Sequence, residues 1–189
     1  MATTHRNTTD RRSHSRLLVT CVLIAMLVPA LALLLGSSSH ASAHATNYVD
    51  GYVYVLNNDL SGSNSITVFN RREDGSLKLA GTTSIGGLGS LTAFADGTQG
   101  SLILTHDEGS RLFAVDAGSN QISVVNVHNG HLSLVGTFSS GGTGPVSLTY
   151  RDGLLYVLNA ANGSTETANV TGFHVDDNGK LHPISGATR

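Results

Sequence analysis

A histidine beside two carboxylates is the feature of this sequence with the clearest chemical potential. His106 is followed directly by Asp107 and Glu108. An imidazole oriented by a carboxylate can act as a general base near neutral pH. A later segment that resembles this one holds Arg151–Gly153 at the same place, a composition typical of a tight turn. We therefore favour the interpretation of His106–Glu108 as a polar turn over that of a catalytic group.

Two more histidines, His128 and His131, flank an Asn-Gly pair. A metal site needs three or four convergent ligands, and the sequence offers no obvious third one here. We expect a solvated hairpin tip and no metal. The glycine-rich stretches Gly86–Gly89 and Gly141–Gly144 lack the Gly-Lys-Ser/Thr of a phosphate loop, so no cofactor is expected.

Three polar residues, Asn57, Asp116 and Asn159, are the best candidates for a binding role. Each ends a short apolar run. Their side chains could face the central channel of a ring-shaped fold and bind a ligand. The alternative, which we favour, is that they form hydrogen bonds with local backbone at a strand end, as Asn and Asp often do.

These residues belong to a repeat of strand-like segments. The apolar runs are Val53–Asn58, Leu112–Ala117 and Leu155–Ala160. The second segments are Ser65–Asn70, Gln121–Asn126 and Asn169–His174, and the third ones begin at Asp74-Gly75, Asn129-Gly130 and Asn178-Gly179. A fourth segment, Ser101–Thr105 or Pro145–Tyr150, precedes the second and third units. Asp-Gly and Asn-Gly pairs are strong hairpin signals because such turns need positive φ.

Four strands per ~45–50 residues is the period of a β-propeller blade. Leu77 and Leu79 alternate as a half-buried strand requires. The continuously apolar run Tyr54–Leu56 is typical of an inner strand covered on both faces by neighbouring blades. We predict an all-β fold, an open propeller of about three blades with four antiparallel strands each. A flat sandwich of two sheets is the alternative, against which the blade-length repeat argues.

The N-terminal region predicts export. Arginines precede an apolar run at residues 17–35, and Ala41-Ser42-Ala43 follows it as a cleavage site. We expect a signal peptide at 1–43 and a secreted or cell-surface domain at 44–189. The alternative is that residues 17–35 stay as a membrane anchor, which leaves the same domain outside the cytoplasm.

Composition narrows the possible partners. The net charge of −2 gives no sign of a surface for nucleic acid, so we expect none as a partner. The single cysteine, Cys21, cannot form an internal disulfide, so packing must stabilise the fold. The partner is then an unknown small molecule or protein.

The repeat resembles a known family. The run Tyr54–Asn57, the segment Ile66–Phe69 and the turn Asp74–Leu77 look like those of lactonase-like seven-bladed propellers, and Asp107–Val124 is the closest match. The family includes the 6-phosphogluconolactonases and the fungal 3-carboxymuconate cyclases, and the resemblance covers roughly residues 48–189. It implies lactone hydrolysis or formation, carried out by His, Glu and Arg side chains from several blades, a set that cannot be placed in this chain.

A seven-bladed ring needs roughly twice the residues available after Ala43 at this repeat length. We therefore expect a truncated or fragmentary member that acts as a binding or scaffold module, and that self-associates through its open blade edges. The alternative function is that of a lactone hydrolase or cyclase. A reading frame that is a fragment of a longer gene is the third possibility.

Overall fold

The computed structural model describes residues 48–90, 99–105, 110–161 and 165–189. The predicted export segment, the boundary after Ala43 and the His106–Glu108 cluster lie outside these ranges. Every regular element in the described ranges is a β-strand, and they contain no helix long and apolar enough to cross a membrane. The residues from 48 onward belong to one compact unit.

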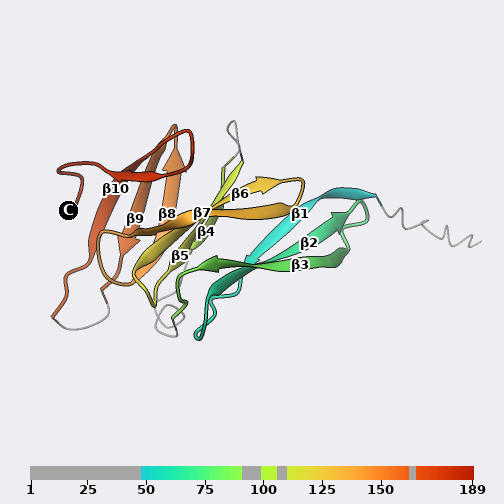
Figure 1. Cartoon of the computed structure of the whole chain (residues 1–189), viewed down its shortest axis with the longest axis horizontal. Helices are drawn as coiled ribbons and strands as arrows, with labels where there is room; N and C mark the ends of the chain where they lie inside the picture. The colour runs from blue at the N-terminus through green and yellow to red at the C-terminus, as the bar shows by residue number, and fades with distance from the viewer. Residues whose placement is uncertain (1–47, 91–98, 106–109, 162–164) are drawn as a thin grey trace, which may run out of the picture. The chain divides into compact units, whose positions relative to one another are not determined.

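Three antiparallel sheets make up this unit, and we call them blades 1, 2 and 3 (Figure 1). Blade 1 holds β1 (Val49–Leu56), β2 (Asn64–Arg72) and β3 (Leu77–Gly86). Blade 2 holds β4 (Leu102–Leu104), β5 (Arg111–Asp116), β6 (Gln121–His128) and β7 (His131–Ser139). Blade 3 holds β8 (Pro145–Arg151), β9 (Leu154–Asn159), β10 (Asn169–Val175) and β11 (Leu181–Pro183). Within each sheet, strands that are consecutive in sequence are neighbours, so the predicted all-β meanders are confirmed.

The tightest hairpins form where the sequence places Asn-Gly and Asp-Gly. Asn129 and Gly130 both have positive φ, 48° and 77°, and join β6 to β7. Asp152 and Gly153, with φ of 49° and 78°, join β8 to β9 in the same way. Two consecutive positive φ values define a type I′ turn, whose twist matches that of the flanking strands. The predicted hairpin at Asn129-Gly130 and the predicted tight turn at Arg151–Gly153 are confirmed.

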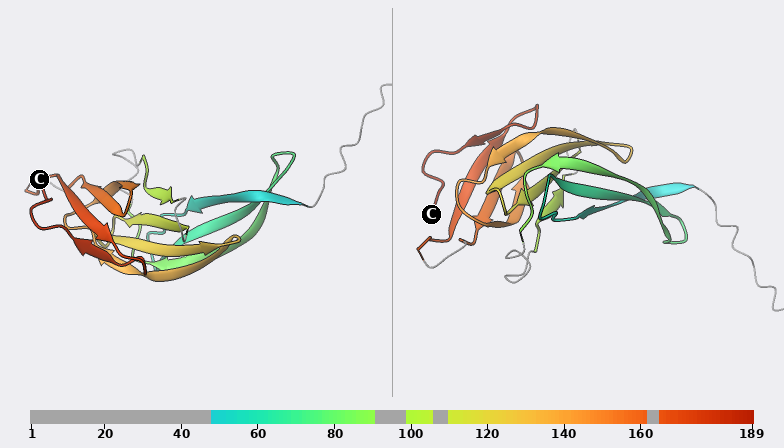
Figure 2. Two further views of the ribbon diagram at one scale, coloured as in Figure 1. Left: turned by 90° about the horizontal axis from the view of Figure 1, so that it is seen from above. Right: turned by 60° about the horizontal axis from the view of Figure 1, so that its bottom comes forward.

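The central strands of the middle sheet, β5 and the first half of β6, are buried on both faces, because blades 1 and 3 both pack against this sheet (Figure 2). Side chains of β5 point alternately to either side. Leu112 and Ala114 pack in a cluster with blade 1, while Phe113 and Val115 pack in a cluster with blade 3. Full burial of a large apolar side chain of this kind contributes about 1.5–3 kcal/mol.

The two outer sheets are covered on one face only. Val55 of β1 is 43% exposed and Leu158 of β9 is 42% exposed, although both lie in apolar runs like that of β5. The prediction that these apolar runs are covered on both faces by neighbouring blades is therefore right for β5 and wrong for β1 and β9. The runs also differ from the expected inner strands in position: β5 and β9 lie second in their sheets, between β4 and β6 and between β8 and β10.

Candidate functional site

Two of the three polar residues that end the apolar runs lie at a seam, by which we mean the contact between two neighbouring blades. Asp116 is the last residue of β5 and Asn159 is the last residue of β9, and both side chains are 0% exposed. Asn57 directly follows β1 and is exposed. The three positions are equivalent, because in each blade this residue lies opposite the start of the next strand: Ser65, Gln121 or Asn169.

Asp116 joins blade 2 to blade 1. Its Oδ1 accepts a hydrogen bond of 2.9 Å from Asn64 Nδ2 of β2, and its Oδ2 lies 2.6 Å from Ser123 Oγ of β6. The same Ser123 oxygen lies 2.7 Å from the carbonyl oxygen of Ile85 in β3. Gly87 crosses so close that a Cβ there would lie 2.2 Å from Asp116 Cγ. Burial raises the pKa of the Asp116 carboxyl to about 6.

Asn159 joins blade 3 to blade 2 in the same way. Its Nδ2 donates to the carbonyl oxygen of Ser140, at 3.2 Å, and to Asn169 Oδ1 of β10, at 2.9 Å. Gly142 crosses this side chain as Gly87 crosses Asp116, with 2.7 Å from its would-be Cβ to the Asn159 side chain. The Oδ1 of Asn159 is buried with no protein partner among the described residues. The segments Ile85–Gly87 and Ser140–Gly142 are therefore equivalent, and we call each a connector.

Asn57 in blade 1 keeps only the contacts within its own blade. Its Nδ2 donates to Ser65 Oγ at 2.7 Å and to Thr67 Oγ1 at 3.0 Å. No connector covers it in the described part of the chain. Asn57, Asp116 and Asn159 thus share no partner, since each lies at a strand end of its own blade and forms its own set of hydrogen bonds. A ligand-binding role for them stays a prediction, and substrate could not reach the buried Asp116 or Asn159 in this conformation.

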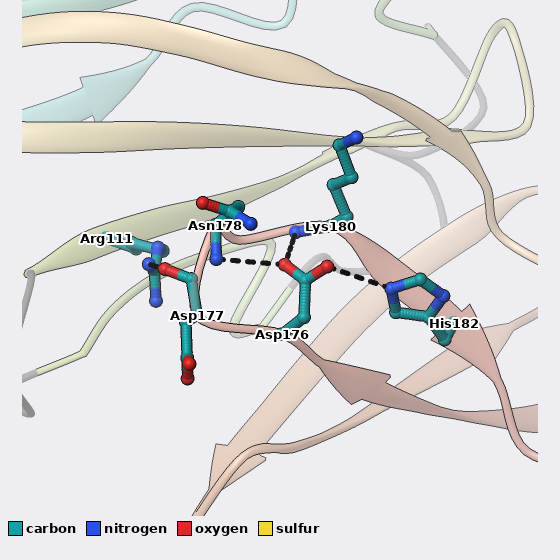
Figure 3. Close-up of polar contacts among 6 residues, drawn as sticks. All are labelled: Arg111, Asp176, Asp177, Asn178, Lys180 and His182. Carbon is teal, nitrogen blue, oxygen red and sulfur yellow. Dashed lines mark hydrogen bonds and ion pairs between the residues drawn. The ribbon is translucent and has the colours of Figure 1, made fainter.

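The outer ends of the seams are held by hairpin-tip glycines. Gly130 of blade 2 packs on the ring of Tyr52 in blade 1, where a Cβ would lie 2.3 Å from Cε1. Gly179 of blade 3 packs on Arg111 in blade 2, with 2.9 Å from its would-be Cβ to Nε. The Arg111 guanidinium also donates to the carbonyl oxygen of Asp177 (Figure 3). Blades 1 and 2 thus each present one side chain to the hairpin tip of the following blade.

Figure 3 shows a carboxylate–imidazole pair in the same hairpin of blade 3. The Asp176 carboxylate lies 3.0 Å from His182 Nε2 and accepts the backbone N–H groups of Asn178 and Lys180. These bonds, that of His182 first, hold the pKa of Asp176 below its usual range. No hydroxyl or thiol belongs to this network, so it closes a turn and lacks a nucleophile.

The described residues contain no group of three side chains able to hold a metal ion. His128 and His131 are paired across the β6–β7 hairpin and are exposed, which is the solvated tip that the sequence predicts. The His106–Glu108 alternative is not tested, since these residues lie outside the described ranges.

One groove lies between the first strands of blades 2 and 3. It has a volume of about 390 Å³, and the polar residues that line it are Thr105, Thr149, Arg151 and Asp152. Arg151 pairs with Asp152 at 3.3 Å, with both side chains nearly fully exposed. Hydroxyls beside a guanidinium are suited to an anionic or polyhydroxylated ligand.

Sequence reasoning missed the partners of the strand-end residues. The sequence predicts a turn position for Asn64 and ordinary strand positions for Ser123 and Thr171. A signal was present in the sequence. Ser123 and Thr171 fall at the same place in their repeats, and Gly87 and Gly142 each belong to a glycine pair near the end of the last strand of a blade. Only the contact across the seam gives that recurrence a meaning.

Three antiparallel meanders, packed face to face and linked by glycine-rich connectors, define the β-propeller class. The chain belongs to the lactonase family within that class, because residues 51–188 match the family model "Lactonase, 7-bladed beta-propeller". The resemblance predicted from the sequence is therefore confirmed.

Two solved structures are similar to this chain. One is a proposed 6-phosphogluconolactonase from Bacteroides uniformis ATCC 8492, with 19% identity, a TM-score of 0.37, and coverage of 72% of this chain and 53% of that one. The other is a proposed 6-phosphogluconolactonase (BF1038) from Bacteroides fragilis NCTC 9343, with 20% identity, a TM-score of 0.38, and coverage of 73% and 53%. The chain spans about half the length of both. No curated protein matches it.

Proposed function

We propose that this protein is an exported binding or scaffold module of the lactonase family, which acts by joining its two open blade faces to further blades of the same type. One observation carries this proposal. Blade 1 repeats, at Asn57 and Thr67, the polar positions that meet a connector at Asp116 with Ser123 and at Asn159 with Thr171. The open face of blade 1 therefore has the groups that receive a neighbouring blade.

The apolar content of both open faces supports the same proposal. On blade 1 the register places Val53, Phe69 and Leu79 in one row, and Leu79 is 60% exposed. On blade 3 Leu158 lies opposite Val170, and both are about 40% exposed. Sheet faces of this kind bury their side chains only against a neighbour, so they favour association.

Association is tested by sedimentation of the purified chain and of charged variants of each face. The open face of blade 1 is disrupted by Val55→Lys with Leu79→Lys, and that of blade 3 by Leu158→Lys. Leu60→Lys, an exposed apolar position outside the strands, is the matched control. We expect the wild type and the control to associate and each face variant to lose the assembly.

A mixture of the two face variants distinguishes the mode of association. If the face of blade 1 binds the face of blade 3, one good face remains on each variant, and equal amounts form a 1:1 dimer. If like faces bind each other, each variant still dimerises alone. A wild type that stays monomeric at all concentrations contradicts the proposal.

Export is the part of the proposal that rests on residues 17–43. The apolar run and Ala41-Ser42-Ala43 support cleavage before His44. N-terminal sequencing of the extracellular product tests this. A product that retains Met1 or Ala2 contradicts cleavage and favours the membrane-anchored alternative.

The second candidate function is that of an enzyme, either a lactone hydrolase or a cyclase that forms a lactone. The family match favours it, together with Arg151 and the threonines in the groove between β4 and β8. Incubation of the purified chain with 6-phosphogluconolactone decides between the two. The scaffold proposal expects no turnover, whereas turnover that Arg151→Ala abolishes favours the enzyme.

A further inference from the structure

The hydrogen bonds around Asp116 contain one proton too few for an ionised carboxylate. Ser123 Oγ lies within 2.7 Å of the Ile85 carbonyl oxygen and within 2.6 Å of Asp116 Oδ2. A serine hydroxyl has a single proton to donate. An ionised carboxylate and a carbonyl both only accept, so one of these two short contacts would then hold no proton.

Asn64 cannot supply the missing proton. Its Oδ1 accepts the backbone N–H groups of Asp59 and Ser65, at 3.1 and 2.9 Å, which fixes the direction of the amide. Its Nδ2 therefore donates to Asp116 Oδ1, and nothing from this residue reaches Oδ2. The contact between Oδ2 and Ser123 must be satisfied by Asp116 itself.

We infer that Asp116 is held as a neutral carboxylic acid whose Oδ2–H donates to Ser123, while Ser123 donates to the Ile85 carbonyl, so that one proton links blade 2 to blade 1. The position of Ile85 fits this role. It lies at a register shift of the β2–β3 ladder, where its carbonyl turns away from the strand pairing toward blade 2. With the proton present, both oxygens of Asp116, the Ser123 hydroxyl and the Ile85 carbonyl each have a hydrogen-bond partner.

The surroundings of Asp116 favour the neutral acid. Among the described residues, β2 presents Asn64, β6 presents Ser123 and the connector presents Gly87, none of which carries a charge. The titratable group in the wider network is Asp59, whose carboxylate accepts from Ser65 Oγ and is not directed at Asp116. The side chain is 0% exposed, and burial without a counter-charge disfavours ionisation.

The seam between blades 1 and 2 therefore weakens as pH rises. Burial raises the pKa of Asp116 in the folded protein to about 6, above its ordinary value of 3.8. Below about pH 4 the acid is neutral in the folded and the unfolded chain, and the full stability is present. The stability is lost as pH rises from about 4 through about 6, because over this range the unfolded chain releases the proton while the folded chain keeps it.

Urea unfolding of the full chain between pH 4 and pH 8 tests this inference. We expect the unfolding equilibrium constant of the wild type to rise roughly 100-fold over this window, since each unit of pKa difference is tenfold. In Asp116→Asn this rise is absent, because the amide donates to Ser123 as the acid does. In the control Asp59→Asn the rise is retained. An unchanged rise in Asp116→Asn overturns the inference.

A second measurement does not depend on the stability of any variant. The ¹³Cγ shift of Asp116 in the native wild type should titrate with a midpoint near 6, and a midpoint at or below 4 overturns the inference. The direction of proton donation is read from Ser123→Ala. Loss of the acceptor of the acid proton lowers the midpoint, whereas loss of a donor to a carboxylate would raise it.

Discussion

Two seams of the same construction hold blade 2 to its neighbours, and they differ in the strand-end side chain at their centre. In both, a glycine of the preceding connector crosses that side chain. The first seam has Asp116, which bonds across the seam to Asn64 through its side chain, whereas the second has Asn159, which bonds to the Ser140 carbonyl. A backbone contact needs no particular side chain on the other blade.

The difference separates what the geometry requires from what each residue adds. Both positions need a planar polar group narrow enough to lie under a glycine. The amide at Asn159 meets this need at any pH, while the acid at Asp116 meets it only with its proton. The stability of the first seam thus depends on pH, and the second seam serves as the reference that does not.

The largest effect is expected from a methyl group on each connector glycine. Gly87 has a φ of +58° and its would-be Cβ lies 2.2 Å from Asp116 Cγ, so Gly87→Ala should lower the free energy of unfolding by about 4 kcal/mol. Gly142 has no positive φ and a wider gap of 2.7 Å, so Gly142→Ala should lower it by about 2 kcal/mol. Urea denaturation measures both.

Gly75→Ala is the control for backbone strain. Gly75 has a φ of +81° and nothing within 4 Å of its would-be Cβ. Gly75→Ala should lower the free energy of unfolding only by the cost of placing alanine in the left-handed conformation, about 1 kcal/mol. If Gly75→Ala is as damaging as Gly87→Ala, strain rather than the close approach to Asp116 explains the effect, and the two seams are not held by their connectors.

Asn159→Asp should convert the second seam into one that depends on pH. A carboxylate there would face two acceptors, the Ser140 carbonyl and Asn169 Oδ1, so its folded pKa should rise. We expect a loss of about 3 kcal/mol at pH 8 and of about 1 kcal/mol at pH 4, where the acid can be neutral. Equal losses at both pH values would show that the seam does not sense charge.

Removal of the hydroxyl beside the strand-end residue should also cost more stability at the first seam than at the second. Ser123 makes contacts of 2.6 and 2.7 Å, and Ser123→Ala leaves the buried Ile85 carbonyl without its donor, for a loss of about 2 kcal/mol. Thr171 makes longer contacts of 3.2 and 3.4 Å, and Thr171→Val should lose about 0.5 kcal/mol. A larger loss at Thr171, in thermal melts at pH 5, would reverse the order of the two seams.

An effect as small as that of Thr171→Val is expected at the outer end of the second seam. Arg111 donates to the Asp177 carbonyl at the surface, and Arg111→Ala should lose about 0.5 kcal/mol. Arg151, which pairs only with the adjacent Asp152 among the described residues, is the control and should show no change. A loss above that of Ser123→Ala would mean that the hairpin tips, and not the connectors, hold the blades.

The strands and turns could be predicted because their signals are local. Asn129-Gly130 and Asp152-Gly153 need positive φ, and that need shows in the residue types alone. The contact of Asp116 with Asn64 could not be predicted, since the two residues are 52 positions apart and in different sheets. The sequence predicted that Asp116 either faces a central channel or bonds to local backbone. In the structure its side chain bonds to Asn64 of the neighbouring blade.

Burial of the apolar runs was only partly predictable for a related reason. The runs that contain Val55, Phe113 and Leu158 have similar compositions, yet Phe113 is fully buried and the other two are more than 40% exposed. An apolar composition shows only that both faces of a strand are suited to burial. The number of sheets beside it decides whether it is covered.

The connector has a consequence for how such chains can grow and be copied. Because Ile85–Gly87 belongs in sequence to blade 1 but fills the strand end of blade 2, a duplication cut at a sheet boundary would separate Asp116 from the glycine that covers it. A duplication that runs from one connector to the next, roughly residues 85 to 139, carries both the cover and the covered residue. The segment that keeps the cover with the covered residue is therefore out of phase with the sheet, and a designer who adds a blade should copy from connector to connector.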